Sequence, residues 1–164
     1  MASKKLTLKS SDGDEFEIEE SIAIQSGTIK YIIEDGYTLI PLPNVNTQNL
    51  ILIIEYMKKH GEKTDSNEEE IKEFDKEFLK GKSYEYMFEL VTAVKYLDIS
   101  DLQHLLCQTI ADRIKNKSLN AMRQILGVVS DYTPEEEKMH REEYNWAYEG
   151  DDIDESLDGT NFNL

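Results

Sequence analysis

Cysteine, basic residues and long apolar runs are all scarce in this chain. Cys107 is the only cysteine among 164 residues, so no internal disulfide can form and a reducing compartment is expected. No stretch approaches the ~18 apolar residues that a membrane helix needs, and the first residues alternate in polarity instead of forming a signal sequence. We therefore expect a soluble protein of the nucleus and cytoplasm.

Positive charge is the next deficit. The sequence holds 34 Asp and Glu residues against 18 Lys and Arg residues, which gives a formal net charge of -16. A field of that sign repels nucleic acid and anionic membranes, and it favours basic partners. Nucleic acid and membranes are therefore excluded from the expected partners.

Motifs for catalysis or ligand binding are also missing. His60, His104 and His140 lie far apart, and with a single cysteine they lack the paired spacing of a zinc site. Neither a phosphate-binding loop nor a dinucleotide-binding glycine motif is present. Carboxylates are numerous, but the sequence singles out no pair of them for acid–base chemistry. We expect no enzymatic activity, no catalytic residue, no cofactor and no metal site.

Hydropathy patterns in the first part of the chain predict both strands and helices. Alternation on either side of an Asp-Gly turn predicts a hairpin over residues 6–18, and 38–42 has the pattern of a further short strand. Helical spacing is found over 29–36 and over 47–61, where Thr47 is the predicted cap. With 39% apolar residues, the chain can bury one core of modest size.

Polar residues dominate the segment 61–70, which we interpret as a loop or linker before a helical second half. Ser66 and Glu69 have the spacing of a capping box for the helix that follows. Every later segment has helical periodicity. The predicted starts of these helices are Ser83, Ser100, Ser118 and Thr133.

The last predicted helix is acidic and carries little apolar surface. Thr133 is a good cap, Pro134 suits the first helical position, and the glutamates that follow suit the positive end of the helix dipole. We expect this helix to run on through Trp146, with Met139 and Trp146 on one face. Such a helix either needs a partner or uses Trp146 to pack against its own domain. The pattern alone leaves both interpretations open.

In six blocks the sequence resembles the Skp-type adaptors (S-phase kinase-associated protein one), which bridge F-box receptors to the cullin scaffold in SCF ubiquitin ligases. The blocks follow the family's order over about residues 5–149, which makes them far more specific together than singly. On this resemblance the chain is a divergent paralogue. The blocks are Leu8–Gly13, Ile40–Val45, Phe74–Leu79, Ala93–Ile99, Cys107–Asp112, and Thr133–Glu137 with Asn145–Trp146.

The resemblance implies an α/β fold whose BTB/POZ-type core, a small sheet packed with helices, occupies residues 1–114. Helices in 115–149 would leave this core to clasp an F-box, and the acidic tail 150–164 is expected to be disordered. The implied function is that of a non-enzymatic adaptor subunit. It would link F-box substrate receptors to the cullin scaffold for ubiquitination and degradation of substrates.

The resemblance also implies two binding surfaces. Of the residues implied to bind the F-box, those at 106, 110 and 114 have an equally good alternative interpretation, which is packing in the core of the protein. In some family members the proline that matches Pro134 is hydroxylated. The implied F-box-binding residues are Leu106, Cys107, Ile110, Ile114, Met122, Ile125, Leu126 and Trp146. The implied cullin-binding residues are Pro41, Pro43, Asn44, Val45, Lys95 and Tyr96.

One departure from the family pattern concerns the cullin surface. Lys95 stands where the family has an asparagine, next to the retained Tyr96. Lysine is a flexible cation that only donates hydrogen bonds, so any bond accepted by the asparagine carbonyl is lost. The alternative function is therefore a subunit that has lost cullin binding and holds F-box proteins as a chaperone or sequestering partner.

Overall fold

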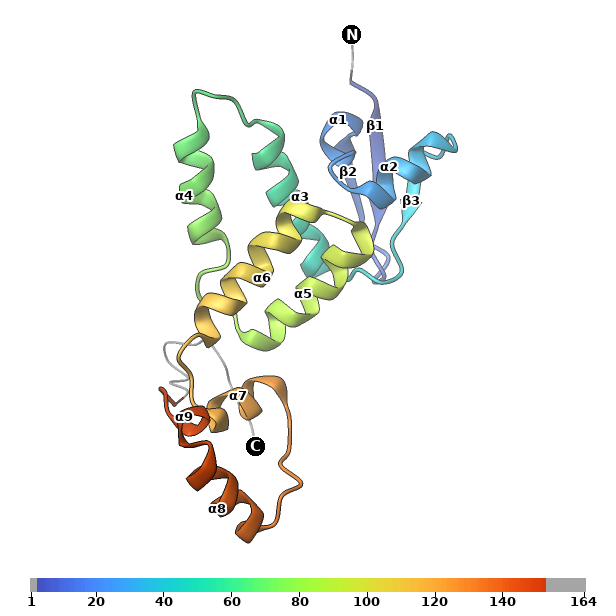
Figure 1. The fold of residues 1–164 in the computed structure, drawn as a ribbon. Coiled ribbons are helices and arrows are strands. Elements are labelled where there is room, and N and C mark those ends of the chain that lie inside the picture. The colour runs from blue at the N-terminus through green and yellow to red at the C-terminus, as the bar shows by residue number, and fades with distance from the viewer. Residues whose placement is uncertain (1–2, 153–164) are drawn as a thin grey trace. The chain divides into compact units, whose positions relative to one another are not determined.

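The computed structural model describes residues 3–152, and Figure 1 shows the order of its helices and strands. The fold is of mixed α/β type, with a small sheet near the N-terminus and helices through the rest of the described chain. Between residues 3 and 152, no helix is both long and apolar enough to cross a membrane.

The chain divides into two compact units, and two helices, α5 (Tyr84–Leu97) and α6 (Ser100–Ile114), contribute residues to both. The first unit combines the N-terminal part up to Lys80 with Phe88–Cys107. The second unit combines Gly81–Met87 with the chain from Gln108 onward. The boundary thus lies inside the helix that ends at Ile114 and not after it. The polar segment 61–70 lies within the first unit and does not link two domains; residues 62–67 of it form a loop between two helices.

The sheet has three strands in the order β2-β1-β3. β1 pairs antiparallel with β2, as the predicted hairpin requires, and parallel with β3. One face is buried in the core, where a fully buried leucine or isoleucine stabilises the fold by about 1.5–3 kcal/mol. The strands are β1 (Lys5–Lys9), β2 (Glu15–Glu19) and β3 (Leu39–Pro41). The residues of the buried face are Leu6, Leu8, Ile18 and Ile40.

Two short helices, α1 (Glu20–Ala23) and α2 (Gly27–Glu34), form the crossover from β2 to β3. Ser26 caps α2, because its hydroxyl accepts a hydrogen bond from the amide of Ile29 at 3.1 Å. Ile29 itself is fully buried. The predicted helix over 29–36 is confirmed, and it begins slightly earlier than expected.

Helix α3 (Thr47–Gly61) is capped by Asn46, so the prediction that Thr47 is the cap is wrong. The side chain of Asn46 accepts a hydrogen bond from the amide of Asn49 at 2.8 Å. Thr47 is the first helical residue, and its hydroxyl donates to the Asp14 carboxylate at 2.6 Å in the hairpin turn. Asn46, one residue earlier, takes the cap position because the Thr47 hydroxyl is engaged with Asp14.

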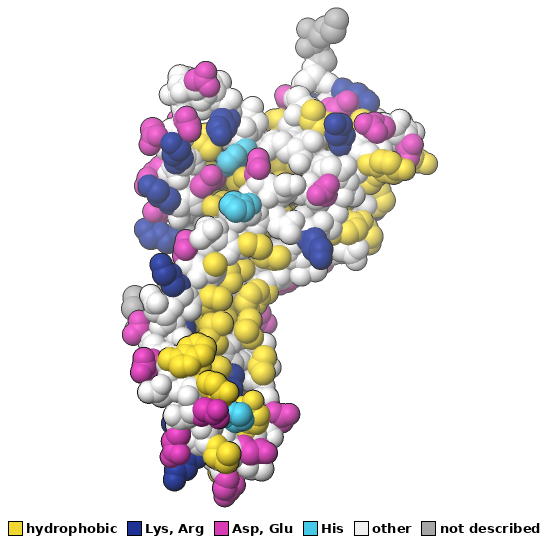
Figure 2. Space-filling view, in the orientation of Figure 1, with side chains coloured by type: hydrophobic (Ala, Val, Ile, Leu, Met, Phe, Trp, Pro, Cys, Tyr) yellow, Lys and Arg dark blue, Asp and Glu magenta, His cyan; other side chains and the backbone are white. Residues whose placement is uncertain are grey.

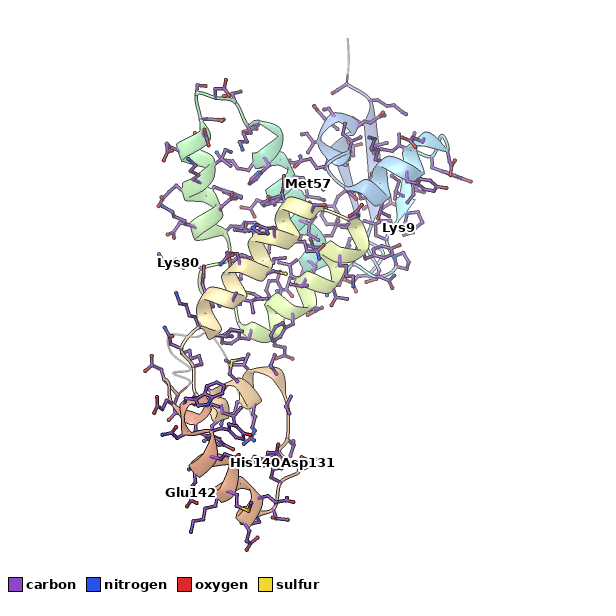
Figure 3. All side chains as sticks on the ribbon, in the orientation of Figure 1. Lys9, Met57, Lys80, Asp131, His140 and Glu142 are labelled. Atoms are coloured by element: carbon purple, nitrogen blue, oxygen red, sulfur yellow. The ribbon has the colours of Figure 1, made fainter. Side chains whose placement is uncertain are left out.

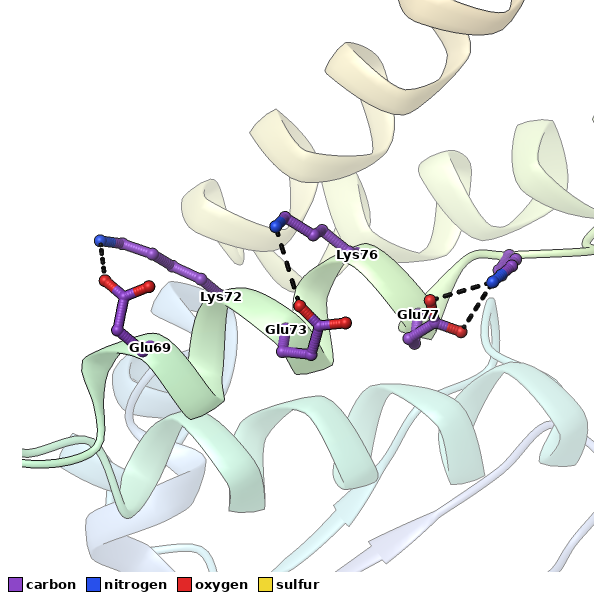
Figure 4. A network of polar contacts seen from close by, with 6 residues as sticks. Glu69, Lys72, Glu73, Lys76 and Glu77 are labelled. Atoms are coloured by element: carbon purple, nitrogen blue, oxygen red, sulfur yellow. Dashed lines mark hydrogen bonds and ion pairs between the residues drawn. The ribbon is translucent and has the colours of Figure 1, made fainter.

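Helix α4 (Glu68–Phe78) packs against α3 through aromatic side chains. The ring centroids of Tyr56 and Phe78 lie 5.6 Å apart, and His60 Nε2 lies 2.7 Å from the Asp75 carboxylate. The outer face carries the ion pairs that Figure 4 shows, and exposed pairs of this kind contribute little to stability. The predicted capping box at Ser66 does not form, because Asn67 holds the cap position.

The remaining helices follow the predicted starts closely. Ser83 accepts a hydrogen bond from the amide of Tyr86 at 3.1 Å, Ser118 caps the next helix, and Thr133 forms a full capping box with Glu136. Gly127 ends its helix with φ of 65°, a left-handed conformation that glycine adopts without strain. The helices are α5 (Tyr84–Leu97), α6 (Ser100–Ile114), α7 (Leu119–Leu126), α8 (Pro134–Glu143) and α9 (Asn145–Tyr148).

The predicted continuous helix through Trp146 is wrong. The chain leaves helical conformation at Tyr144, where φ is -122° and ψ is 48°, and restarts as the short α9. Tyr144 stacks on His140 with ring centroids 6.2 Å apart. His140, labelled in Figure 3, also stacks on Tyr132, so three rings hold the end of α8 and the loop before it. Met139 and Trp146 therefore belong to two different helices.

Candidate protein-binding surfaces

The second unit exposes an unusual amount of apolar surface. Figure 2 shows hydrophobic side chains at the surface of the C-terminal helices. Contiguous apolar surface of this kind marks a protein-binding site in most soluble proteins. We call this set of residues the C-terminal apolar surface. Its large exposed residues are Leu126, Val128, Val129, Tyr132, Met139, Tyr144 and Trp146.

Trp146 is the largest of these side chains, and 71% of its surface is exposed. Of the two interpretations left open by the sequence, packing of Trp146 against its own domain does not occur in the structure. An exposed tryptophan offers a large rigid contact area, which is typical of the residues that dominate protein interfaces. This observation favours a partner for the helix pair α8 and α9.

The scaffold that presents this surface depends on an ion pair between α7 and α8. Arg123 Nη1 lies 2.8 Å from a Glu137 carboxylate oxygen, and both side chains are partly buried. The hydrogen bond from Arg123 lowers the pKa of Glu137, while the same bond to Glu137 raises the pKa of Arg123. The pair thereby fixes the angle between two short helices that have little core of their own.

Acid should weaken this link in a predictable direction. Because the folded pKa of Glu137 lies below its ordinary value of 4.5, the pair stabilises the fold above that pH. The stabilisation is lost as the pH falls through the lowered pKa. We expect Glu137→Gln to reduce the loss of thermal stability in acid, as measured by melting curves over that range. Glu135→Gln, at an exposed position of the same helix, is the matched control, and an equal effect of both variants would contradict the assignment.

A second link joins the chain after α9 to the turn before α7. The amide of Ser118 donates to the carbonyl of Asp151 at 2.9 Å, and the amide of Asp151 donates to the carbonyl of Asn116 at 2.8 Å. The Ser118 hydroxyl also donates to the Asp152 carboxylate at 2.8 Å. We call this pairing of 116–118 with 150–152 the C-terminal strap.

The strap corrects the predicted start of the disordered tail. The sequence placed that start at residue 150, but the described residues 150–152 are paired in the strap. Gly150 makes the pairing possible, because its φ is 124° and a Cβ there would lie 2.5 Å from the carbonyl oxygen of Asn116. The rest of the predicted tail, 153–164, lies outside the described residues.

The predicted F-box residues on α6 differ in exposure. Cys107, Ile110 and Ile114 follow each other at spacings of three and four, so they lie along one face of the helix. Cys107 is exposed, and the two isoleucines are half-buried. Leu106 has 0% exposed surface and therefore supports this face from the core. That each of these side chains contacts a receptor stays a prediction.

The predicted residues on α7 also divide into anchors and supports. Leu126 is exposed and Met122 is half-buried, whereas Ile125 is buried within the described chain. Val128 and Val129, which follow the helix, are also exposed, although they were not among the predicted F-box residues. Their signal in the sequence is the pair of β-branched apolar residues directly after the glycine cap, a position where polar residues are usual.

The predicted cullin-binding residues all lie in the first unit. Pro41, Pro43 and Asn44 are exposed, whereas Val45 is buried and its carbonyl accepts from the amide of Ser11 at 2.8 Å. Val45 therefore anchors the segment and leaves the exposed residues to make contacts. Pro134, the predicted hydroxylation site, is exposed at the first position of α8.

Helix α5 brings the two predicted cullin segments to one side of the first unit. The Asn46 side chain donates to the Glu89 carboxylate at 2.7 Å, which fixes the end of the Pro41–Val45 segment against α5. Tyr96 lies seven residues after Glu89, so both point to the same face of that helix two turns apart. Lys95 next to it is exposed.

A junction between α2 and α5 was not predicted from the sequence. The Thr28 hydroxyl donates to the carbonyl of Tyr96 at 2.7 Å, and the amide of Gly27 donates to the carbonyl of Asp98 at 3.0 Å. A Cβ at Gly27 would collide with the Asp98 carboxylate, so glycine is required by this close approach. The junction places α2 directly beside the predicted cullin residues.

The polar cluster around His60 contributes to the packing of α3 against α4. His60 stacks on Tyr56 with ring centroids 4.0 Å apart, and it bonds to Asp75. Burial and the nearby Asp75 raise the pKa of Tyr56, so this phenol stays protonated over the physiological range. Within residues 3–152, no group of His, Cys, Asp and Glu side chains has the arrangement of a metal site.

Comparison with known protein families gives one match in the N-terminal part of the chain and one in the C-terminal part. Residues 4–62, which contain the sheet and α1 to α3, match the model of the Skp1 family, tetramerisation domain, the POZ domain of that family. This match confirms the predicted BTB/POZ-type core. Residues 100–147 match the Skp1 family, dimerisation domain.

Similar full-length proteins are found in plants. SKP1-like protein 11 of Arabidopsis thaliana is 43% identical over 91% of this chain and 100% of its own length. SKP1-like protein 1A of the same species is 40% identical with the same coverage, and SKP1-like protein 1 of Oryza sativa is 40% identical over 89% of this chain and 96% of its own. The chain belongs to the Skp1 family.

Proposed function

We propose that this protein is an adaptor subunit of an SCF-type ubiquitin ligase, in which it links F-box substrate receptors to the cullin scaffold. Family membership supports the general role. The observation that carries the proposal for this chain is the exposure of Trp146 and its apolar neighbours in the second unit. A surface of this kind fits the apolar face of an amphipathic partner helix, whereas in an isolated chain it would remain exposed to water.

The mechanism is proximity and not chemistry on this chain. A receptor held by the second unit and a cullin held by the first would bring a bound substrate close to the ubiquitin-loaded enzyme. Such a bridge raises the effective concentration of the reacting groups and restricts their orientation. Under this proposal substrates are ubiquitinated and degraded, and the adaptor itself needs no catalytic residue and no cofactor.

On the receptor side, a few apolar anchors would carry most of the binding energy. Trp146 and Leu126 offer exposed area, and the half-buried Met122 lies one turn before Leu126 on α7. Ile110 and Ile114 would extend the same contact from α6. The protein would act in the nucleus and the cytoplasm, and hydroxylation of the exposed Pro134 would modify the start of α8.

The alternative function rests on one residue, Lys95. If this exposed lysine abolishes cullin binding, the chain would hold F-box proteins as a chaperone or sequestering subunit. In that case Lys95→Asn should restore binding to a cullin N-terminal domain in calorimetry. Lys58→Asn, at an exposed lysine of α3 in the first unit, is the matched control and should restore nothing.

The test of the main proposal is direct binding. The purified full-length chain is titrated by calorimetry with a cullin N-terminal domain and, separately, with an F-box domain. We expect both dissociation constants to lie below about 1 µM, which corresponds to more than about 8 kcal/mol of binding free energy. Binding of the F-box without the cullin would support the alternative function. Binding of neither protein would overturn both.

A further inference from the structure

The first unit exposes an apolar surface that none of the predicted site residues explains. Tyr31 on α2, Tyr37 in the turn after α2, and Leu39 on β3 are 69%, 61% and 52% exposed. Figure 2 shows hydrophobic side chains gathered along this side of the unit. We call these three residues the α2–β3 patch. Two tyrosines and a leucine present a contact area well suited to a protein partner.

The local structure presents this patch rigidly. Gly36 turns the chain sharply between α2 and β3 with φ of 89°, and its amide donates to the carbonyl of Ile33 at 2.8 Å. On the other side of Tyr37, the carbonyl of Thr38 accepts from the amide of Thr7 at 2.8 Å. The exposed side chains thus project from a hydrogen-bonded turn, and a partner would gain contact area with little loss of conformational entropy.

The patch lies next to both groups of predicted cullin residues, Pro41–Val45 and Lys95–Tyr96. Leu39 and Pro41 alternate with the buried Ile40 in β3, so their side chains lie on the same exposed face of the sheet. Tyr31 lies one turn after Thr28, whose hydroxyl bonds to the carbonyl of Tyr96. The patch is therefore continuous with the surface on which the proposed function places the cullin.

The charges around the patch are of both signs. Lys9, labelled in Figure 3, pairs in register with Pro41, and Lys30 precedes Tyr31. The exposed Glu34 and Asp35 lie between the two tyrosines in the sequence. The border therefore favours no single sign of charge on a partner, and the apolar side chains carry the contact.

We propose that the α2–β3 patch is a further contact for the cullin, which covers it with an apolar segment. The inference rests on the proposed function, because it takes the cullin as the occupant. It adds Tyr31, Tyr37 and Leu39 to the binding surface.

Calorimetry of the full-length chain with a cullin N-terminal domain tests the inference. We expect Tyr31→Ser and Leu39→Ser each to weaken binding at least about fivefold. Tyr31→Phe should keep the affinity of the wild-type chain, because the ring is retained. Ile51→Ser, at a residue of α3 that is 50% exposed and belongs to neither proposed surface, is the control and should change nothing.

The outcomes separate this inference from the proposed function. If the wild-type chain binds the cullin and the serine variants bind equally well, the patch is no part of the interface while the proposed function stands. If the wild-type chain does not bind, the proposed function fails and the inference fails with it. Unchanged binding to an F-box domain shows that each variant is folded. Self-association of the free chain that Leu39→Ser abolishes would identify a second copy as the occupant and overturn the inference.

Discussion

Replacing Trp146 by alanine should weaken binding to an F-box domain by about 2 kcal/mol or more, which is about 30-fold. The side chain is 71% exposed, so its removal takes little from the free fold and much from an interface that buries it. We therefore expect the melting temperature of the isolated chain to change little. Calorimetry with the F-box domain and a melting curve of the free variant measure the two effects on the same sample.

The matched control is Tyr31→Ala, because Tyr31 is an exposed aromatic residue of similar exposure in the first unit. It should leave binding to the F-box domain within experimental error. If Trp146→Ala lowers the melting temperature of the free chain by many degrees, the tryptophan is a core residue. The interpretation of the C-terminal apolar surface as a receptor site would then lose its main support.

Gly150→Val should disrupt the C-terminal strap and loosen the helix that carries Trp146. The residue has φ of 124°, and a Cβ would lie 2.5 Å from the carbonyl oxygen of Asn116. A branched side chain cannot be accommodated there without moving the backbone, which costs of order 1–3 kcal/mol or breaks the pairing. We expect the amides of Ser118 and Asp151 to lose protection in hydrogen exchange, and F-box binding to weaken at least tenfold.

Two controls separate the strap from the rest of the tail. Gly36→Ala introduces a side chain at another left-handed glycine, but nothing lies within 4 Å of its Cβ, so F-box binding should stay unchanged. A chain that ends at Asp152 keeps every hydrogen bond of the strap and should bind like the full-length chain. Loss of binding in that truncated chain would assign a role to residues 153–164.

Local signals predicted the elements that depend on near neighbours. The hairpin over 6–18 follows from period-two alternation around an Asp-Gly turn, and the structure pairs Leu6 with Ile18 as that pattern requires. The caps at Ser118 and Thr133 follow from hydroxyl side chains three residues before a free amide. These features are decided within a few residues, so the sequence contains all the information that they need.

Several of the wrong predictions concern residues whose partners lie far along the chain. Thr47 is not a cap because its hydroxyl bonds to Asp14, 33 residues earlier. The tail does not begin at Gly150 because its neighbour Asp151 pairs with Asn116. The hydroxyl of Thr28 and the carbonyl of Tyr96, 68 residues apart, form a junction that no periodicity indicates. Tertiary contacts of this range override local preference.

The candidate binding surfaces could be predicted only in part from the sequence. Apolar spacing identified α6 as amphipathic, but it could not tell that Leu106 is buried while its neighbour Cys107 is exposed. Nor could it identify Tyr31, Tyr37 and Leu39 as exposed, since aromatic and aliphatic residues near a strand are usually assigned to the core. Exposure depends on which elements cover which, and only the fold decides that.

Simultaneous binding of both partners tests the adaptor role most directly. The full-length chain, an F-box domain and a cullin N-terminal domain are mixed at equal concentrations and analysed by sedimentation velocity. We predict a single complex with the mass of all three proteins, and no complex between the F-box and the cullin when the chain is left out. Two separate binary complexes that exclude each other, or an F-box complex that never takes up the cullin, would contradict the proposal that this protein bridges the two.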